Sequence, residues 1–378
     1  MSRSVKLILA LLLVFAITPA MPALAQTEDP SCDYYGTHAN GAIYCIEMPP
    51  EGYWNGDLVV FAHGYVPITE PVGIPWPQMM LADGPYTYMP DLINSLGYAF
   101  ATTSYSVNGL AVERGRTDIL DLMEVFNQVV EEPNRAYLVG ASEGALITTL
   151  IVEKHPGVFD GGMALCGPIG DFNEQINYWG NFRVAFDHYM PSFLPPSPVN
   201  IPQDVMDNWD GYALNIGMGL SMADPATVAT LLAVTGAPID PFNPGSIFDT
   251  VLGILWYNVF ATNNGIEVLR GQPFDNLEFE YLDPYLNAIA PRFSADKKAL
   301  GTIEKKYETS GALKRPFLTM HTTLDPIVPY WHITMYAAKV SANSKGGPYM
   351  NIPVDRYGHC NFTTDEIMGG FLWLVSQP

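Results

Sequence analysis

A short motif around one serine has the residue types and spacing of a nucleophile. Residues 140–144 read G-A-S-E-G, which places a glycine two positions to either side of Ser142. A serine hydroxyl is a weak nucleophile at neutral pH, so it needs a geometry that exposes its oxygen and a base that accepts its proton. Between a strand and a helix, Gly140 and Gly144 allow the sharp turn that exposes the serine. The motif predicts acyl transfer at Ser142, and the alternative is a chance match in a tight turn.

An acid and a base follow this serine in the order that the chemistry requires. Asp325 lies in H-T-T-L-D-P-I-V-P, just after an apolar run at 316–322, and His359 lies in R-Y-G-H-C, just after the last apolar run. Each is expected on a loop at the end of a strand, where the orienting acid and the general base accompany this nucleophile motif. Asp171 is the alternative acid, and an aspartate before Pro326 is also common in simple turns.

Two other histidines compete with His359 for the role of base. His321 lies within the run at 316–322, which favours a histidine of the core, and His332 is expected to face outward or to pack near an inserted cap. His359 alone follows the last apolar run on a glycine-flanked loop, which can fold back toward Ser142. Position therefore favours His359.

The negative oxygen that forms during acyl transfer needs two preorganised donors. The backbone N–H of Glu143, directly after the serine, is the first expected donor. The sequence F-A-H-G-Y at 61–65 supplies a loop after an early strand, and the backbone N–H of Tyr65 is the second. His63 is expected to shape this loop through hydrogen bonds and to take no part in the chemistry.

The elements that must position these residues alternate along the chain between about 57 and 170. Apolar runs indicate strands, and the segments 114–131 and 144–154 indicate helices between them. This alternation predicts an α/β fold with a mostly parallel central sheet flanked by helices. A closing helix is expected around 363–375. The predicted strands are 57–63, 98–103, 135–140, 161–166, 316–322 and 349–357.

After Gly170 the alternation stops until the run at 316–322, and we interpret the interval as a large, mainly helical cap inserted after the sixth sheet strand. The most apolar part, 247–262, is interpreted as a buried cap helix in preference to an interfacial one. Aromatic residues near the start of the cap are expected in its core or in an acyl pocket: Trp179, Phe182, Phe186 and Tyr189. Cap helices are expected at about 203–220, 225–234, 247–262 and 294–309. The predicted domains are 26–170 and 314–378 for the hydrolase core and 171–313 for the cap or lid.

The N-terminus has the pattern of a secretory signal peptide. Arg3 and Lys6 precede an uninterrupted apolar run at 7–17, and the sequence A-L-A at 23–25 is a small-residue cleavage site. The run is shorter than the roughly 20 residues that span a bilayer. Residues 1–25 are therefore predicted to be removed on export to the periplasm or the medium, with no stable membrane insertion afterwards.

The composition argues against several kinds of partner. The chain has 18 basic and 39 acidic residues, and removal of 1–25 takes away two basic and no acidic residues, so the net charge changes from −21 to −23. This charge disfavours nucleic acids and anionic membranes as partners.

The cysteines lack C-x-x-C spacing and the seven histidines are scattered, so no metal and no other cofactor is predicted. Two disulfides are possible, in three pairings, among Cys32, Cys45, Cys166 and Cys360.

The motifs H-G-Y, G-A-S-E-G, T-L-D-P-I-V-P and Y-G-H-C occur in the order typical of the α/β-hydrolase superfamily. The chain resembles its serine esterases and lipases over about 55–170 and 314–378. The resemblance implies that Ser142 is the nucleophile, His359 the general base and Asp325 the acid that orients it. A small-molecule or polymeric ester is the implied substrate. The motif H-G-Y has a single glycine before Tyr65, and in this it resembles the corresponding motif of esterases that act on short to medium acyl groups, aryl esters or polyesters.

Half of a cysteine pair is shared with the tannase and feruloyl-esterase relatives within this superfamily. In these enzymes a cysteine directly before the serine is joined to one directly after the histidine. Cys360 stands in the second place here, but Ala141 stands in the first. In this fold the histidine loop crosses above the strand beside the nucleophile strand, and Cys166 ends that strand. The resemblance therefore implies a bridge between Cys166 and Cys360, with Cys32 and Cys45 closing a small N-terminal loop.

Two other functions compete with ester hydrolysis. A serine peptidase resembling the prolyl oligopeptidase group uses the same triad, but such enzymes usually carry a further glycine after the elbow, where Ala145 stands here, and an N-terminal propeller. A catalytically silent binding protein on the same scaffold typically lacks a triad residue, and all three are present.

The glycosylation sequon at 361–363 is expected to be unused, because a glycan there would obstruct the base.

Overall fold

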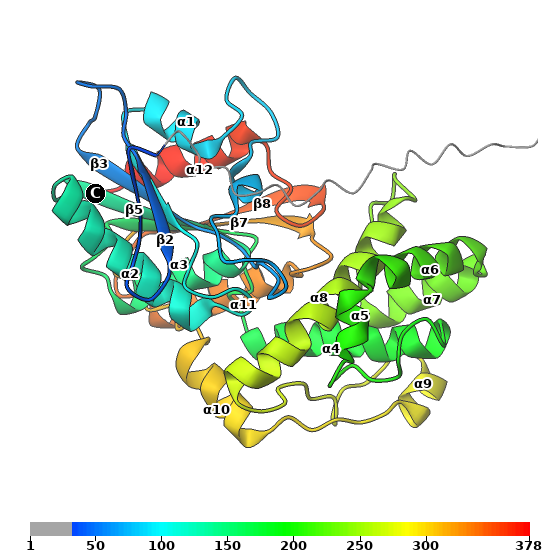
Figure 1. Cartoon of the computed structure of the whole chain (residues 1–378). Coiled ribbons are helices and arrows are strands. Elements are labelled where there is room, and N and C mark those ends of the chain that lie inside the picture. The colour runs from blue at the N-terminus through cyan, green and yellow to red at the C-terminus, as the bar shows by residue number, and fades with distance from the viewer. Residues whose placement is uncertain (1–31) are drawn as a thin grey trace, which may run out of the picture. The chain divides into compact units, whose positions relative to one another are not determined.

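The computed structural model describes residues 32–378 (Figure 1), and the predicted signal peptide at 1–25 lies outside this range. A single mixed sheet with the strand order β1-β2-β4-β3-β5-β6-β7-β8 forms the centre of the described part. The strands from β3 onward pair in parallel, whereas β1 and β2 are antiparallel additions at one edge. The strands are β1 (Tyr34–Thr37), β2 (Ile43–Glu47), β3 (Asp57–Ala62), β4 (Ala99–Thr103), β5 (Arg135–Ala141), β6 (Gly161–Leu165), β7 (Phe317–Leu324) and β8 (Tyr349–Tyr357).

Helices cover both faces of the sheet, which explains why its inner parallel strands are largely apolar. In β3, Leu58 and Val60 pack in one hydrophobic core, and Val59 and Phe61 pack in the other. The first core also contains side chains of α2 (Val112–Val129), α3 (Glu143–Lys154) and α11 (Trp331–Asn343). The second contains side chains of α1 (Met89–Ser95) and α12 (Thr364–Val375). Because successive residues of β3 face opposite cores, its sequence from Leu58 to Ala62 shows no alternation of polar and apolar residues.

This arrangement confirms the predicted fold class. A mostly parallel sheet with helices on both faces, and with a G-x-S-x-G turn between β5 and α3, is the α/β-hydrolase fold. The six predicted strands match β3 to β8 to within two residues at each end. No prediction covers β1, β2, α1 or α11.

Between β6 and β7 the chain forms a series of helices, referred to here as the helical insertion. The helix expected at 203–220 is divided at Asn208 into α5 and α6, and the other three expected helices correspond to α7, α8 and α10. The division into a hydrolase core at 26–170 and 314–378 and a cap or lid at 171–313 stays a prediction. The insertion comprises α4 (Phe172–Tyr189), α5 (Gln203–Asp207), α6 (Trp209–Met222), α7 (Pro225–Thr235), α8 (Ser246–Leu269), α9 (Pro284–Ile289) and α10 (Lys297–Lys306).

The helix α4 differs from the sequence prediction, which assigned no helix to its residues. Asp171 caps its N-terminus, where the side chain accepts a hydrogen bond from the backbone N–H of Glu174 at 3.0 Å. Buried side chains lie all around the helix and include the polar Arg183, so α4 lacks the one-sided apolar stripe from which a helix is predicted. Among the four aromatic residues expected near the start of the cap, Phe182 and Phe186 are fully buried in the core.

The apolar helix α8 is buried along one side, where Val251, Ile254, Leu255 and Val259 are fully inaccessible to solvent. This burial agrees with the interpretation of this segment as a core helix. Within residues 32–378 no single helix is both long and apolar enough to cross a bilayer, and only α6 and α7 together, bent by 115°, meet the criteria of length and composition.

Candidate active site

Ser142 lies at a sharp turn between β5 and α3, with φ of 55° and ψ of −120°. This positive φ is strained for a residue with a side chain, and such strain is typical of functional sites. A Cβ atom at Gly140 would overlap the carbonyl oxygen of Gly144, and one at Gly144 would overlap the carbonyl oxygen of Ala62. Both predicted elbow glycines are therefore required by close backbone approach.

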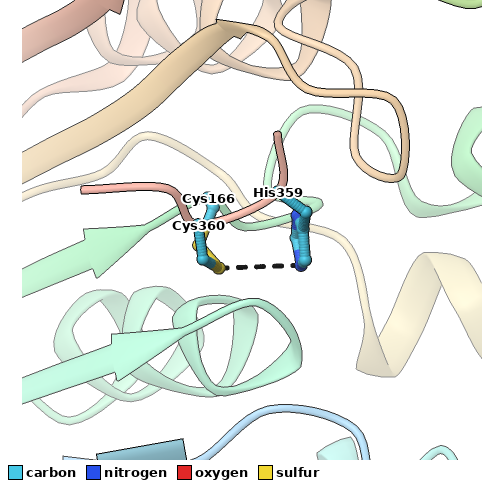
Figure 2. Close-up of side chains that lie close together, drawn as sticks. All are labelled: Cys166, His359 and Cys360. Carbon is cyan, nitrogen blue, oxygen red and sulfur yellow. Dashed lines mark hydrogen bonds between the residues drawn. A yellow bond between two sulfur atoms is a disulfide. The ribbon is translucent and has the colours of Figure 1, made fainter. Parts of the chain in front are cut away.

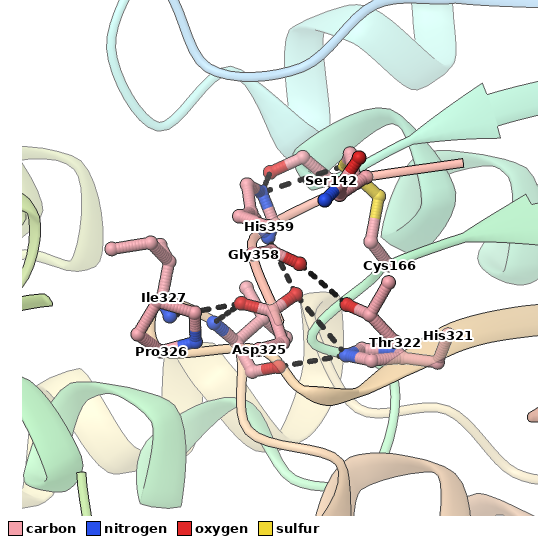
Figure 3. Close-up of polar contacts among 12 residues, drawn as sticks. Ser142, Cys166, His321, Thr322, Asp325, Pro326, Ile327, Gly358 and His359 are labelled. Atoms are coloured by element: carbon pink, nitrogen blue, oxygen red, sulfur yellow. Dashed lines mark hydrogen bonds and ion pairs between the residues drawn. A yellow bond between two sulfur atoms is a disulfide. The ribbon is translucent and has the colours of Figure 1, made fainter. Parts of the chain in front are cut away.

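The structure brings the three predicted triad residues together in one hydrogen-bonded series (Figure 3). His359 Nε2 lies 2.9 Å from Ser142 Oγ, and His359 Nδ1 lies 2.7 Å from Asp325 Oδ2. An ionised carboxylate only accepts hydrogen bonds, so Nδ1 carries the imidazole proton and Nε2 is left to accept the serine proton. The geometry required for a general base between a nucleophile and an orienting acid is thus present.

Asp325 is fully buried at the end of β7 and is held on both of its oxygens. Its Oδ1 accepts the backbone N–H groups of Ile327 at 2.9 Å and Val328 at 3.0 Å. Burial by itself raises the pKa of this carboxyl, but His359 and His321 outweigh burial and lower the pKa to about 2. The group is therefore ionised at neutral pH and can stabilise a positive charge on His359.

The competing residues occupy structural positions. Asp171, the alternative acid, is the N-cap of α4. His321 is buried within β7, with Nε2 at 2.7 Å from the carbonyl oxygen of Val328 and 3.4 Å from Asp325 Oδ2. His332 does not face outward; it is buried and lies against α4, where its Nε2 is 2.8 Å from Gln175 Oε1.

The two expected oxyanion donors lie beside the elbow with no competing acceptor. Within residues 32–378, neither the N–H of Tyr65 nor that of Glu143 donates a hydrogen bond to another protein group. A Cβ atom at Gly64 would lie 3.1 Å from the Cβ of Ser142, so the loop that carries Tyr65 is packed against the serine. Two unpaired N–H groups next to a nucleophile are suited to stabilise a negative oxygen.

Gln78 holds this loop and was not identified from the sequence. It lies in the 3-10 helix η1 (Trp76–Met79), where its Oε1 accepts the N–H of Gly64 at 2.7 Å and its Nε2 donates to the carbonyl of Tyr65 at 3.2 Å. The one side chain therefore fixes the orientation of both peptide groups. A lone glutamine in a proline-rich loop carries no sequence signal of such a role.

His63 has the structural role expected of it. Its Nδ1 donates to the carbonyl of Gly64 at 2.7 Å, and its ring stacks on Tyr105 at a centroid distance of 3.8 Å. The hydroxyl of Tyr105 in turn donates to the His63 carbonyl at 3.0 Å. Burial lowers the pKa of His63 to about 4, so the ring is neutral at pH 7.

Both expected disulfides are present, and one of them contacts the base. Cys166 is bonded to Cys360, and Cys32 is bonded to Cys45. Figure 2 shows the Cys360 sulfur facing the imidazole, with Sγ at 3.6 Å from His359 Nε2. Both clusters of potential metal ligands found within 32–378 contain one of these bridges, whose sulfurs are not free thiolates. Two disulfides are compatible with an exported protein.

Removal of the bridge beside the base is expected to lower activity before the fold is lost. In the double variant Cys166→Ser, Cys360→Ser, the loop carrying His359 is released, and kcat should fall by roughly tenfold or more because the imidazole is less well placed. The loss of the bridge should also lower the free energy of unfolding by about 2–5 kcal/mol. Kinetics at a temperature where near-UV circular dichroism shows a folded protein test this, with Cys32→Ser, Cys45→Ser as the matched control. Unchanged kinetics in the first variant would contradict it.

Glu143 carries a second feature of the elbow besides its backbone N–H. Its side chain is buried at the start of α2, where Oε1 accepts the N–H of Ala111 at 2.7 Å. Burial raises the pKa of this carboxyl to about 8, despite hydrogen bonds from the backbone of Ala111 and Val112. The carboxyl is therefore protonated at neutral pH and adds no negative charge beside the developing oxyanion.

The raised pKa of Glu143 predicts a specific dependence of stability on pH. The folded protein keeps this proton up to about pH 8, whereas the unfolded chain loses it above its ordinary pKa of about 4.3, so stability falls as pH rises between these values. The slope should be about 1.4 kcal/mol per pH unit. In Glu143→Gln this contribution disappears, whereas the exposed control Glu124→Gln should follow the wild type. Urea unfolding at pH 5 and pH 8 measures it, and identical slopes for all three proteins would refute it.

No family model matches the chain, and no curated protein sequence matches it. Solved structures resemble it at low identity. An acylaminoacyl peptidase from Pyrococcus horikoshii is 13% identical over 89% of this chain and 38% of its own, with a TM-score of 0.44. Feruloyl esterase B from Aspergillus oryzae is 13% identical over 87% and 73%, with a TM-score of 0.46. An esterase from Pyrococcus furiosus is 9% identical over 91% and 90%, with a TM-score of 0.44.

The chain spans only 36 to 38% of the length of the acylaminoacyl peptidases that it resembles. At these identities and TM-scores the likeness carries no information about substrate or reaction.

Proposed function

We propose that this protein of α/β-hydrolase fold is an exported serine hydrolase that cleaves carboxylic esters through an acyl-enzyme on Ser142. The observation that carries the proposal is the unbroken series from Ser142 Oγ through His359 to the ionised Asp325, at 2.9 and 2.7 Å. These are the distances required for proton transfer between a nucleophile and its base. Export is supported by the two disulfides and by the leader-like N-terminal sequence.

The proposed reaction begins when Ser142 Oγ attacks the carbonyl carbon of the ester as His359 Nε2 takes its proton. The carbonyl oxygen becomes negative and accepts hydrogen bonds from the N–H groups of Tyr65 and Glu143. His359 then gives its proton to the oxygen of the leaving alcohol, and the acyl group stays on the serine. A water molecule, deprotonated by His359, attacks the acyl carbon; the proton returns to Ser142 Oγ and the carboxylic acid leaves. Asp325 stabilises the positive imidazole in both halves.

The helical insertion supplies groups beside this site, which supports a role in substrate selection. The ring of Tyr65 lies 5.8 Å from each of the rings of Trp256 and Tyr257 on α8. Closer to the base, the hydroxyls of Thr250 on α8 and Tyr357 are 2.8 Å apart, and Tyr357 precedes His359 by two residues. One helix thus contacts both the oxyanion loop and the base loop, so the acyl or alcohol group of the substrate is proposed to lie against α8.

Esters of p-nitrophenol with acyl chains of two to sixteen carbons test the proposal on residues 26–378. We expect turnover that peaks at a defined chain length, because the substrate is proposed to lie against α8, and a site bounded by this helix accepts acyl chains only up to a limited length. Aminoacyl p-nitroanilides belong in the same panel, since the triad is also compatible with peptide cleavage. Hydrolysis of the anilides without hydrolysis of any ester would replace the esterase proposal by a peptidase. A folded protein that hydrolyses neither would contradict both.

A further inference from the structure

We infer that Gln175 and His332 form a relay of hydrogen bonds that positions the triad acid, so that α4 of the insertion belongs to the catalytic apparatus. The inference rests on the proposed function, since it concerns the acid of the same triad. Neither residue touches the serine or the base. Both are positioning residues, which act through the loop that follows Asp325.

The first step of the relay is the peptide of Ile327. This peptide group joins Ile327 to Val328. Its N–H, which belongs to Val328, donates to Asp325 Oδ1 at 3.0 Å, and its carbonyl oxygen, which belongs to Ile327, accepts two hydrogen bonds, from Gln175 Nε2 at 3.0 Å and from Trp179 Nε1 at 3.1 Å. The neighbouring carbonyl of Pro326 accepts the hydroxyl of Tyr178 at 2.9 Å. Three donors on one face of α4 therefore hold the loop that sets the orientation of the Asp325 carboxylate.

The second step fixes the direction of each hydrogen bond. The N–H of Gly170 donates to His332 Nδ1 at 3.1 Å, so Nδ1 is unprotonated and the imidazole proton is on Nε2. His332 Nε2 then donates to Gln175 Oε1 at 2.8 Å, which leaves the amide nitrogen of Gln175 to face the Ile327 carbonyl. Burial lowers the pKa of His332 well below its ordinary value, so the ring stays neutral and keeps this arrangement. The side chains of His332 and Gln175 therefore each have only one orientation that satisfies all of these hydrogen bonds.

The hydrogen bond from Gln175 does more than satisfy a buried polar group. Gln175 and His332 are completely buried, and the indole of Trp179 already satisfies the Ile327 carbonyl. The second donor from Gln175 is therefore not needed to avoid an unpaired group. Hydrogen bonds in series strengthen one another, so a doubly bonded Ile327 carbonyl makes the N–H of the same peptide group, that of Val328, a stronger and better-aligned donor to Asp325 Oδ1. The relay is expected to hold the carboxylate where His359 Nδ1 meets it.

The variant Gln175→Met tests the relay, because it keeps the volume of the side chain and removes its hydrogen bonds. With the best ester substrate we expect kcat to fall roughly 10- to 100-fold while KM changes less than about twofold, since the acid is misplaced and the pocket is not. The pH profile of kcat/KM should have its acid limb at lower pH, because a displaced carboxylate stabilises the imidazolium less. If Gln175→Met does not fold, Trp179→Phe removes one donor only, and a smaller fall in kcat is expected.

The matched control is Gln272→Met, which removes a glutamine amide from another part of the insertion. Gln272 Nε2 donates to the carbonyls of Phe274 at 2.8 Å and Ser294 at 3.1 Å, with no link to the acid loop. Its kcat and pH profile should equal those of the wild type. If Gln175 had a purely structural role, Gln175→Met would be less stable but its pH profile would keep the acid limb of the wild type and of the control, and this result would overturn the relay.

A measurement without turnover separates the relay from the proposed function. The proton between His359 Nδ1 and Asp325 should give a low-field proton resonance, which Gln175→Met should shift or broaden and Gln272→Met should leave unchanged. If the wild type hydrolyses esters and Gln175→Met retains the wild-type kcat, pH profile and resonance, the relay is wrong and the esterase proposal stands. If the wild type hydrolyses no ester, the esterase proposal fails, and the change or constancy of the resonance alone supports or overturns the relay.

Discussion

Replacement of Ser142 by alanine is expected to lower kcat for ester hydrolysis by about a factor of 10⁶, the loss typical of a serine nucleophile removed from an intact triad. The change deletes only Oγ, and the strained φ of 55° at this position is already imposed by the surrounding backbone. Substrate binding and the oxyanion donors remain, so a small residual rate above the uncatalysed reaction is expected.

The matched control for this change is Ser221→Ala, which removes an exposed hydroxyl that donates to a carbonyl within α6 at 2.9 Å. Steady-state kinetics of both variants on the best p-nitrophenyl ester provide the comparison. The control should retain wild-type kinetics. A Ser142→Ala protein that keeps more than about a tenth of the wild-type kcat would exclude an acyl-enzyme on this serine.

The change Asp325→Asn is expected to lower kcat by roughly 10⁴-fold, because it favours the tautomer of His359 that cannot act as a base. Oδ1 of Asp325 accepts two backbone N–H groups, so an asparagine must place its carbonyl oxygen there and turn its NH2 group toward His359. His359 Nδ1 would then accept a hydrogen bond, and the imidazole proton would move to Nε2. A protonated Nε2 cannot take the proton of Ser142.

Asp171→Asn is the matched control, because Asp171 is the other aspartate considered for this role. Asparagine is also a good helix N-cap, so the start of α4 should be kept and kcat should stay within about threefold of the wild type. Kinetics of both variants over a range of pH separate the two assignments. Comparable losses in the two variants, or a loss in Asp171→Asn alone, would be evidence against Asp325 as the orienting acid.

The parts of this protein that were predictable from the sequence are those in which chemistry and local pattern coincide. Ser142, Asp325 and His359 each follow an apolar strand, and the carboxyl ends of parallel strands meet at one edge of the sheet. The elbow glycines and the pairing of Cys166 with Cys360 follow from the same arrangement. Each of these features is encoded in a short segment, and the order of the segments along the chain already indicates the fold that brings them together.

The parts that were not predictable depend on contacts between distant segments. Gln78 binds backbone groups of another loop 13 and 14 residues earlier, and Gln175 binds the carbonyl of Ile327 and the ring of His332 more than 150 residues later. Nothing in the neighbouring sequence marks either amide. The helix α4 is surrounded by other elements, so burial removes the one-sided pattern that identifies a helix. The edge strand β1 is short, and Tyr34 and Tyr35 in it are exposed, so it lacks the apolar run of the inner strands.

The central claim is that Ser142 is an activated nucleophile, and labelling with a fluorophosphonate followed by peptide mass spectrometry tests it most directly. The reagent forms a covalent phosphonyl adduct on a serine only when a base takes its proton and an oxyanion hole receives the phosphoryl oxygen. The account predicts a single adduct on the peptide that contains Ser142, absent from Ser142→Ala and formed much more slowly by Asp325→Asn. A folded wild-type protein that remains unlabelled, or that is labelled at another residue, would contradict it.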